Sequence, residues 1–133
     1  EVTESVAVVG LDKVAGLLGR LKGMGITVAI DDFGTGYSSL SYLEKLPANR
    51  LKIDRTFVKA LERNDNGTRI ARTIIALGRE LNLKIVAEGV ENAHLAQVVK
   101  DLGCTEAQGY HYGKPMSEEA FLAWLAQHPA GLA

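Results

Sequence analysis

The chain has 133 residues, of which 47% are hydrophobic and 23% are charged, and its formal net charge is −1. This balance fits one soluble globular domain with a sizeable core, and it excludes a disordered chain or the strongly basic surface typical of DNA and RNA binding. No apolar run is long enough to cross a membrane, and no signal peptide opens the chain. The lone Cys104 cannot form an internal disulfide, which agrees with a reducing cytosol.

Hydrophobic spacing predicts alternating helices and strands from residue 11 onward. A helix is predicted over 11–24, and a short β-branched run predicts a buried strand over 26–30. A second helix over 40–46 is stopped by Pro47, and the next strand covers 50–54.

The second half of the chain continues this alternation. Its predicted elements are a polar turn over 63–67, a helix over 70–81 ended by Asn82, a strand over 83–87, a helix over 95–102 capped by Asn92, a weaker strand over 105–110, and a last helix capped by Ser117 with Phe121, Trp124 and Leu125 buried. About four strand–helix units follow the first helix, and they predict an α/β fold with a parallel sheet.

Polar residues lie at or just past the carboxyl ends of successive predicted strands. They are Asp31, Asp32, Lys52, Asp54, Glu88 and Gln108. In a (β/α)₈ barrel such ends converge on one mouth, whereas in an open doubly wound sheet they spread along one edge. The pattern favours the barrel, and because a complete barrel takes roughly 250 residues, this chain supplies about half of one.

The adjacent Asp31 and Asp32 concentrate negative charge at a strand end. Mg²⁺ and Mn²⁺ prefer such oxygen ligands, although aspartates also favour turns and helix caps, and for this pair both interpretations stay open. The tripeptide Asp32-Phe33-Gly34 matches a kinase motif without its companion loops. Gly34 and Gly36, with Asp54 further on, imitate a dinucleotide-binding fingerprint that lacks its third glycine.

Lys52 lies between two apolar strand residues and is expected to point away from them. A lysine inside a barrel is costly unless carboxylates or a phosphate pair with it; the alternative is a solvent-facing lysine on an edge strand. Beside a metal it could orient the attacking water or stabilise charge on phosphorus. Glu88 and Glu91 could act as metal ligand and general base, or form an exposed acidic loop before a helix.

Together these stretches resemble the EAL family through essentially the whole chain. The matching segments, in the family's order, are Glu1-Val2-Thr3-Glu4-Ser5, Asp31 to Ser39, Lys52-Ile53-Asp54, Ala87 to Glu91, and Gln108-Gly109-Tyr110 followed by Lys114-Pro115. The resemblance implies a TIM-like (β/α)₈ barrel, with residues 1–133 as the C-terminal portion of a single EAL domain. It further implies hydrolysis of the bacterial second messenger cyclic di-GMP to linear pGpG, with two Mg²⁺ or Mn²⁺ ions.

The resemblance also assigns roles to individual residues. Metal ligands are Glu1, Asp31, Asp32 and Glu88, and the catalytic residues are Lys52 and Glu88. Substrate-binding or loop-supporting roles fall to Gln108, Glu91, Gly34, Thr35, Gly36 and Pro115. The loop after Asp32 is expected to mediate a homodimer, as it does in the family.

The name-giving Glu-Ala-Leu segment and the metal-binding asparagine after it are not in this sequence. We therefore expect this chain alone to be weakly active or inactive, and its parent to be an enzyme of the bacterial cytoplasm. By resemblance, the parent can carry sensor or diguanylate cyclase domains and a membrane tether outside this chain. The alternative is a degenerate EAL domain that binds cyclic di-GMP as a receptor without cleaving it; the intact carboxylates and Lys52 favour catalysis.

Overall fold

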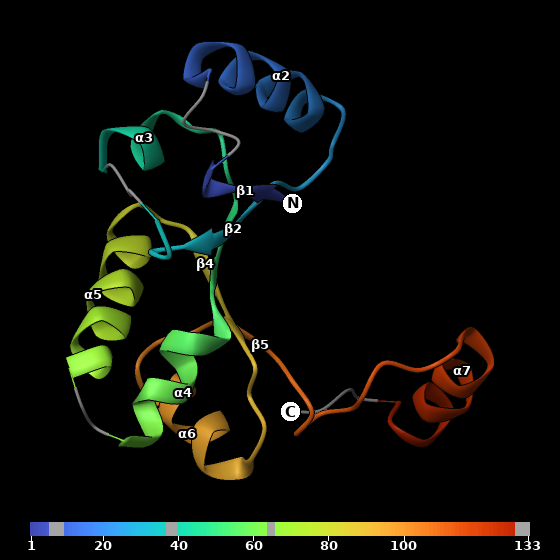
Figure 1. Cartoon of the computed structure of the whole chain (residues 1–133). Helices are drawn as coiled ribbons and strands as arrows, with labels where there is room; N and C mark the ends of the chain where they lie inside the picture. Colours follow the sequence, from blue (N-terminus) through green and yellow to red (C-terminus); the bar gives the residue numbers. More distant parts are fainter. Residues whose placement is uncertain (6–9, 37–39, 64–65, 130–133) are drawn as a thin grey trace.

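The structure is a computed structural model that describes residues 1–5, 10–36, 40–63 and 66–129. Its centre is a five-stranded sheet in which every pair of neighbouring strands is parallel (Figure 1). The strands are β1 (Val2–Thr3), β2 (Ala29–Phe33), β3 (Arg50–Ile53), β4 (Lys84–Glu88) and β5 (Glu106–Gln108). They follow one another in chain order, as in a barrel segment, whereas a doubly wound sheet reverses its order part-way.

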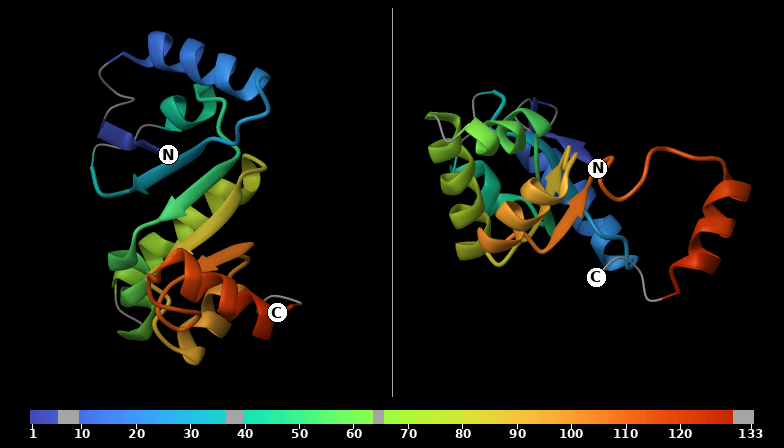
Figure 2. Two further views of the ribbon diagram at one scale, coloured as in Figure 1. Left: turned by 90° about the vertical axis from the view of Figure 1, so that its right-hand side faces the viewer. Right: turned by 90° about the horizontal axis from the view of Figure 1, so that it is seen from below.

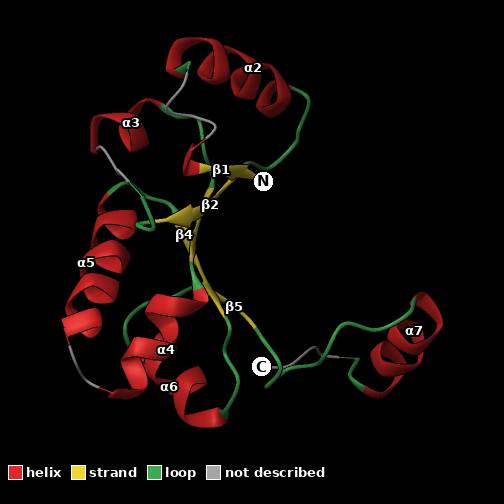
Figure 3. Ribbon diagram, in the orientation of Figure 1, coloured by secondary structure: helices red, strands yellow, loops and turns green. Residues whose placement is uncertain are grey.

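Six helices belong to the described part of the chain. They are α2 (Leu11–Gly23), α3 (Leu40–Lys45), α4 (Arg55–Arg63), α5 (Asn66–Glu80), α6 (Ala93–Asp101) and α7 (Glu118–Gln127). Figure 3 shows α4, α5 and α6 together on one side of the strands, with α7 standing apart on the other side. Helices along one side of a parallel sheet are the arrangement of a partial barrel. None of the described helices has both the length and the apolar character to span a bilayer.

The hydrophobic core lies between the sheet and these helices. Alternate strand residues point into it, and Ile30, Leu51 and Ile85 are each 0% exposed. The residues between them, such as Lys52, point to the opposite face of the sheet. This alternation divides each strand into a core side and a side that carries polar groups.

The predicted helix ends are confirmed where side chains cap them. Asn92 accepts a hydrogen bond from the backbone N–H of Leu95 at 2.9 Å, and Ser117 accepts one from Ala120 at 3.2 Å. Asn82 takes a left-handed backbone with φ of 57°, which ends α5 as predicted.

The structure differs from the predicted elements in several places. Strand β1 was not predicted, and α5 begins at Asn66, inside the predicted turn. The second strand begins at Ala29 instead of residue 26, and Ile26 is 45% exposed, because the chain reverses at Gly25 with φ of +84° before it enters the sheet. Helix α4 was not predicted; Asp54 belongs to its start, since its carboxylate accepts from the backbone N–H of Thr56 at 2.8 Å.

A further error concerns α7, whose apolar residues were expected to be buried. Phe121 is 45% exposed and Leu125 is 39% exposed, and Trp124 is only half-buried. The right-hand view in Figure 2 shows α7 separated from the other helices. In the part of the chain that the structure describes, Phe121 and Trp124 border a hollow lined by residues after β5 and stack on each other.

Candidate active site

Lys52 is the centre of a cluster of charges on the polar side of the sheet. Its side chain is only 8% exposed, and its Nζ lies 2.8 Å from Glu1 Oε1 and 2.5 Å from Glu88 Oε1. Asp31 Oδ2 is 3.8 Å away. The inward orientation predicted for Lys52 is therefore confirmed, and three carboxylates supply the pairing that a buried ammonium needs. We call Lys52, Glu1, Asp31, Asp32 and Glu88 the Lys52 cluster.

An irregularity in β2 brings two neighbouring aspartates into this cluster. The pairing of β2 with β3 shifts between Ile30 and Phe33, where Asp31 and Asp32 stand opposite the single residue Lys52. In a regular strand adjacent side chains point to opposite faces, but a bulge of this kind turns a side chain back. Asp32 has a left-handed backbone, with φ of 55°. The bulge and this conformation explain how both carboxylates reach one site.

Asp31, Asp32 and Glu88 form a set of oxygen donors that fits a hard divalent cation. One carboxylate oxygen from each lies within 4.8 Å of the others. Mg²⁺ and Mn²⁺ take carboxylate oxygens together with water, so the chemistry of this donor set suits them. Glu1, the fourth predicted ligand, directs its carboxylate to Lys52 in this structure.

The proximity of these charges shifts several pKa values. Burial, followed by repulsion from Asp31 and Asp54, raises the pKa of Asp32 above its ordinary value. The hydrogen bond from Lys52 holds the pKa of Glu1 below its ordinary value. Burial opposes the charged form of Lys52, yet its bonds to Glu1 and Glu88 raise its pKa overall. Lys52 is thus a fixed cation, and a positive neighbour would favour the ionised form of Asp32.

The loop after β2 is supported by Glu4, a residue that the sequence did not single out. Glu4 is buried, and its Oε2 accepts a hydrogen bond from the backbone N–H of Gly34 at 3.2 Å. The hydroxyl of Tyr42 donates to the Glu4 carbonyl at 3.2 Å. The second glutamate of the Glu1-Val2-Thr3-Glu4 match was the available signal. Residues 37–39 of this loop lie outside the described residues.

Glu91, to which the loop-supporting role was assigned, has an exposed side chain in the loop after β4. Its role stays a prediction, since the carboxylate seen to reach the loop among the described residues is that of Glu4. Thr35 is exposed, and its hydroxyl and backbone N–H both donate to the Asp32 carbonyl, at 2.6 and 3.2 Å. Gly36 is exposed as well.

Gln108 lies beside Glu88, with which it pairs in the register of β4 and β5. Its side chain is exposed and borders the hollow that Pro115 also lines. Gln108 therefore stands at the same edge of the sheet as the Lys52 cluster. Pro115 lies beyond the strand, on the way to α7.

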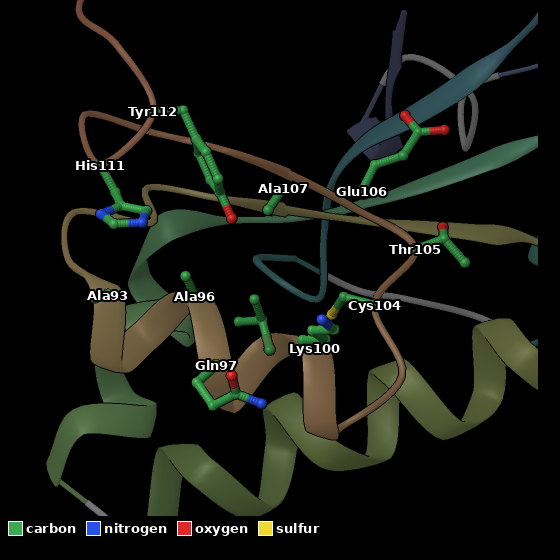
Figure 4. A pocket seen from close by; sticks show the side chains of 11 residues that line it. Ala93, Ala96, Gln97, Lys100, Cys104, Thr105, Glu106, Ala107, His111 and Tyr112 are labelled. Carbon is green, nitrogen blue, oxygen red and sulfur yellow. The ribbon is translucent and has the colours of Figure 1, made fainter. Parts of the chain in front are cut away.

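Cys104 belongs to a separate cavity of about 820 Å³ between α6 and the segment 104–112 (Figure 4). None of the residues of the Lys52 cluster lines this cavity. Burial raises the pKa of the Cys104 thiol from 9.0 to about 11. A thiol in this state lacks the thiolate that nucleophilic catalysis requires, which supports a packing role.

We expect Cys104 to react with Ellman's reagent at pH 8 about 100-fold more slowly than a cysteine in an unfolded peptide, because its thiolate fraction is lower by that factor. The rate should recover when the same protein is unfolded in urea. A folded-state rate equal to that of the peptide would contradict the raised pKa.

A comparison with known protein families covers the part of the chain that contains the Lys52 cluster. The family model described as "EAL domain" matches residues 1–115. The chain belongs to the EAL domain family. MucR of Pseudomonas aeruginosa, a bifunctional diguanylate cyclase/cyclic di-GMP phosphodiesterase, is 50% identical to this chain over 126 residues, which are 95% of the chain and 18% of MucR.

Solved EAL structures share the fold of this chain. The MucR phosphodiesterase, in complex with c-di-GMP, is 49% identical with a TM-score of 0.85 over 90% of this chain and 49% of that one. The EAL domain of Mycobacterium smegmatis DcpA is 42% identical with a TM-score of 0.86 over 98% of this chain and 58% of that one. The chain therefore spans about half of each of these two structures and forms a partial TIM-like barrel, as the sequence predicted.

Proposed function

We propose that this chain forms the C-terminal half of a metal-dependent phosphodiesterase that hydrolyses cyclic di-GMP to linear pGpG. The observation that carries the proposal is the Lys52 cluster, in which a buried lysine and converging carboxylates stand at the carboxyl ends of parallel strands. In support, the similar MucR protein is named a cyclic di-GMP phosphodiesterase.

In this proposal the carboxylates hold the divalent cations. Asp31, Asp32 and Glu88 supply oxygen donors from neighbouring strands, and Glu1 joins them by turning from Lys52. A cluster of bare carboxylates would repel the negatively charged phosphate. Bound cations would compensate that charge and would supply an activated water.

The remaining residues orient the substrate and move protons. The Lys52 ammonium donates to the attacking water and to the phosphoryl oxygens as charge develops on phosphorus. Glu88, held by Lys52, accepts the proton of that water. One P–O ester bond breaks as the new P–O bond forms, and the proton that Glu88 accepted passes to the leaving ribose oxygen. Gln108, Gly34, Thr35, Gly36 and Pro115 are proposed to support the loop or contact the substrate at the rim of the site.

The test is hydrolysis of cyclic di-GMP by a complete EAL domain that contains these residues, of the length seen in the solved relatives, with Mg²⁺ or Mn²⁺. We expect Asp31→Ala to abolish formation of pGpG, while Asp101→Ala, an exposed aspartate on α6, leaves the rate unchanged. The 133-residue chain alone is expected to be inactive or nearly so.

Two outcomes would contradict the proposal. A complete domain that binds cyclic di-GMP but forms no pGpG would favour a receptor that binds without cleaving. Equal hydrolysis by Asp31→Ala and by the unaltered domain would remove Asp31 from the site. The predicted homodimer through the loop after Asp32 is a separate question, which sedimentation of the same domain would answer.

A further inference from the structure

The loop after β4 and the segment after β5 are joined across Gly109. The backbone N–H of Val90 donates to the Gln108 carbonyl at 3.0 Å, and the N–H of His111 donates to the Val90 carbonyl at 3.0 Å. Both backbone polar groups of Val90, which is 0% exposed, are thus satisfied on either side of Gly109. We call residues 89–90 and 108–111 the Gly109 clasp.

The two segments approach so closely that Gly109 has no room for a side chain. A Cβ at Gly109 would lie 2.1 Å from the Val90 carbonyl oxygen and 2.4 Å from its nitrogen. Carbon–oxygen contacts below 3.0 Å are essentially never found, so the backbone would have to move by about 1 Å. At Gly113 a Cβ would meet only the flexible end of Met116, at 3.4 Å.

Gly89, on the β4 side of the Gly109 clasp, also has no room for a side chain. Gly89 has a φ of +76°, and a Cβ at Gly89 would lie 2.5 Å from the Cβ of Arg55 at the start of α4. The Gly89–Val90 peptide is therefore packed between Arg55 and Gly109. Because Arg55 leaves no room on one side, a side chain at Gly109 would have to displace this peptide in another direction and part it from residues 108–111.

Glu88 directly precedes this peptide. Its Oε1 lies 2.5 Å from Lys52 Nζ, and its carboxylate is one of the three grouped donors. Gln108, its partner in the register of β4 and β5, is the residue next to Gly109. A displacement of about 1 Å would lengthen this contact to about 3.5 Å, beyond the usual range of an N–H···O hydrogen bond.

We propose that Gly109 is a positioning residue that holds Glu88 and Gln108 in register through the Gly109 clasp. The expected effect of Gly109 on the rate of hydrolysis rests on the proposed phosphodiesterase function. The expected effect of Gly109 on cation binding does not depend on that function. A misplacement of about 1 Å typically costs about 100-fold in rate, and an outer-shell change costs about 10- to 100-fold in metal affinity.

The experiment compares Gly109→Ala with the matched control Gly113→Ala in the complete EAL domain. Titration calorimetry with Mn²⁺ should show an affinity about 10-fold weaker or more for Gly109→Ala and an unchanged affinity for Gly113→Ala. The kcat for cyclic di-GMP should fall about 100-fold for Gly109→Ala alone. Circular dichroism establishes that both variants are folded.

The outcomes separate this inference from the proposed function. The unaltered domain could fail to hydrolyse cyclic di-GMP while Gly109→Ala binds Mn²⁺ more weakly than the unaltered domain does. In that case the positioning role of Gly109 is supported and the proposed function is wrong. If the unaltered domain is active and the two alanine variants match it in both measurements, the positioning role of Gly109 is wrong.

A second measurement covers the case in which Gly109→Ala does not fold. In the unaltered domain, Mg²⁺ should slow amide hydrogen exchange at Val90 and His111 by the same factor, because one clasp protects both groups. Slower exchange at Asp31 with no change at Val90 and His111 would overturn the proposal.

Discussion

We expect Lys52→Met to lower the kcat for cyclic di-GMP hydrolysis about 10²- to 10³-fold in the complete EAL domain. Methionine has nearly the length of lysine and fills the same space, but it carries no charge. The change therefore removes the ammonium that touches Glu1 and Glu88 and leaves their carboxylates without that partner. Initial rates of pGpG formation at saturating Mg²⁺ would measure the loss.

The same substitution should change the pH dependence of stability. The raised pKa of Lys52 means that its contribution is complete below its ordinary 10.5 and is lost above it. The lowered pKa of Glu1 means that its contribution is present above 4.5 and is lost as the pH falls. Without added metal, the free energy of unfolding of Lys52→Met should therefore fall below that of the unaltered domain between these limits.

Lys59→Met is the matched control, since Lys59 is an exposed lysine on α4. Urea unfolding at pH 3 and pH 7 should show a stability loss for Lys52→Met that shrinks at pH 3, and no such pattern for Lys59→Met. Equal rates for Lys52→Met and the unaltered domain would exclude Lys52 from the reaction.

The barrel segment was predictable because its strands carry a simple pattern. Leu51 and Ile53 alternate with Lys52, and polar residues end each strand, so the core side and the polar side of the sheet followed from the residues themselves. Helix α7 shows the limit of the same reasoning. The pattern of Phe121 and Leu125 identifies an apolar face but not the element that covers it, and in the described chain that face is exposed.

The Lys52 cluster was predicted in its composition but not in its geometry. Residues at strand ends could be assigned to one mouth, whereas the bulge that turns Asp31 and Asp32 together depends on the pairing of β2 with β3. Glu4 was missed for a related reason, since its contact with Gly34 joins residues 30 positions apart in the chain. Such contacts depend on tertiary packing, which local sequence patterns do not encode.

Asp32, which lies in the bulge of β2, is expected to lower the stability of the fold when no cation is bound. Its left-handed backbone is unfavourable for most residues with a Cβ, and aspartate and asparagine are among those that tolerate it better. Its pKa is raised by burial and by Asp31 and Asp54, so the folded state destabilises the ionised form. A raised carboxyl pKa lowers stability as the pH rises through the window just above 3.8, and the penalty persists at neutral pH.

We therefore expect Asp32→Asn to raise the free energy of unfolding without metal at pH 7, and to lower kcat about 10³-fold. A cation stabilises only a protein that binds it, by RT ln(1 + [L]/Kd), where [L] is the free cation concentration. With excess Mg²⁺ the unaltered domain should therefore have the higher free energy of unfolding and Asp32→Asn the lower. Urea unfolding with and without Mg²⁺ measures both effects, with Asp101→Asn as the control. A variant less stable than the unaltered domain in the absence of Mg²⁺ would contradict this trade-off, because it would mean that the Asp32 carboxylate stabilises the fold and does not merely bind the cation.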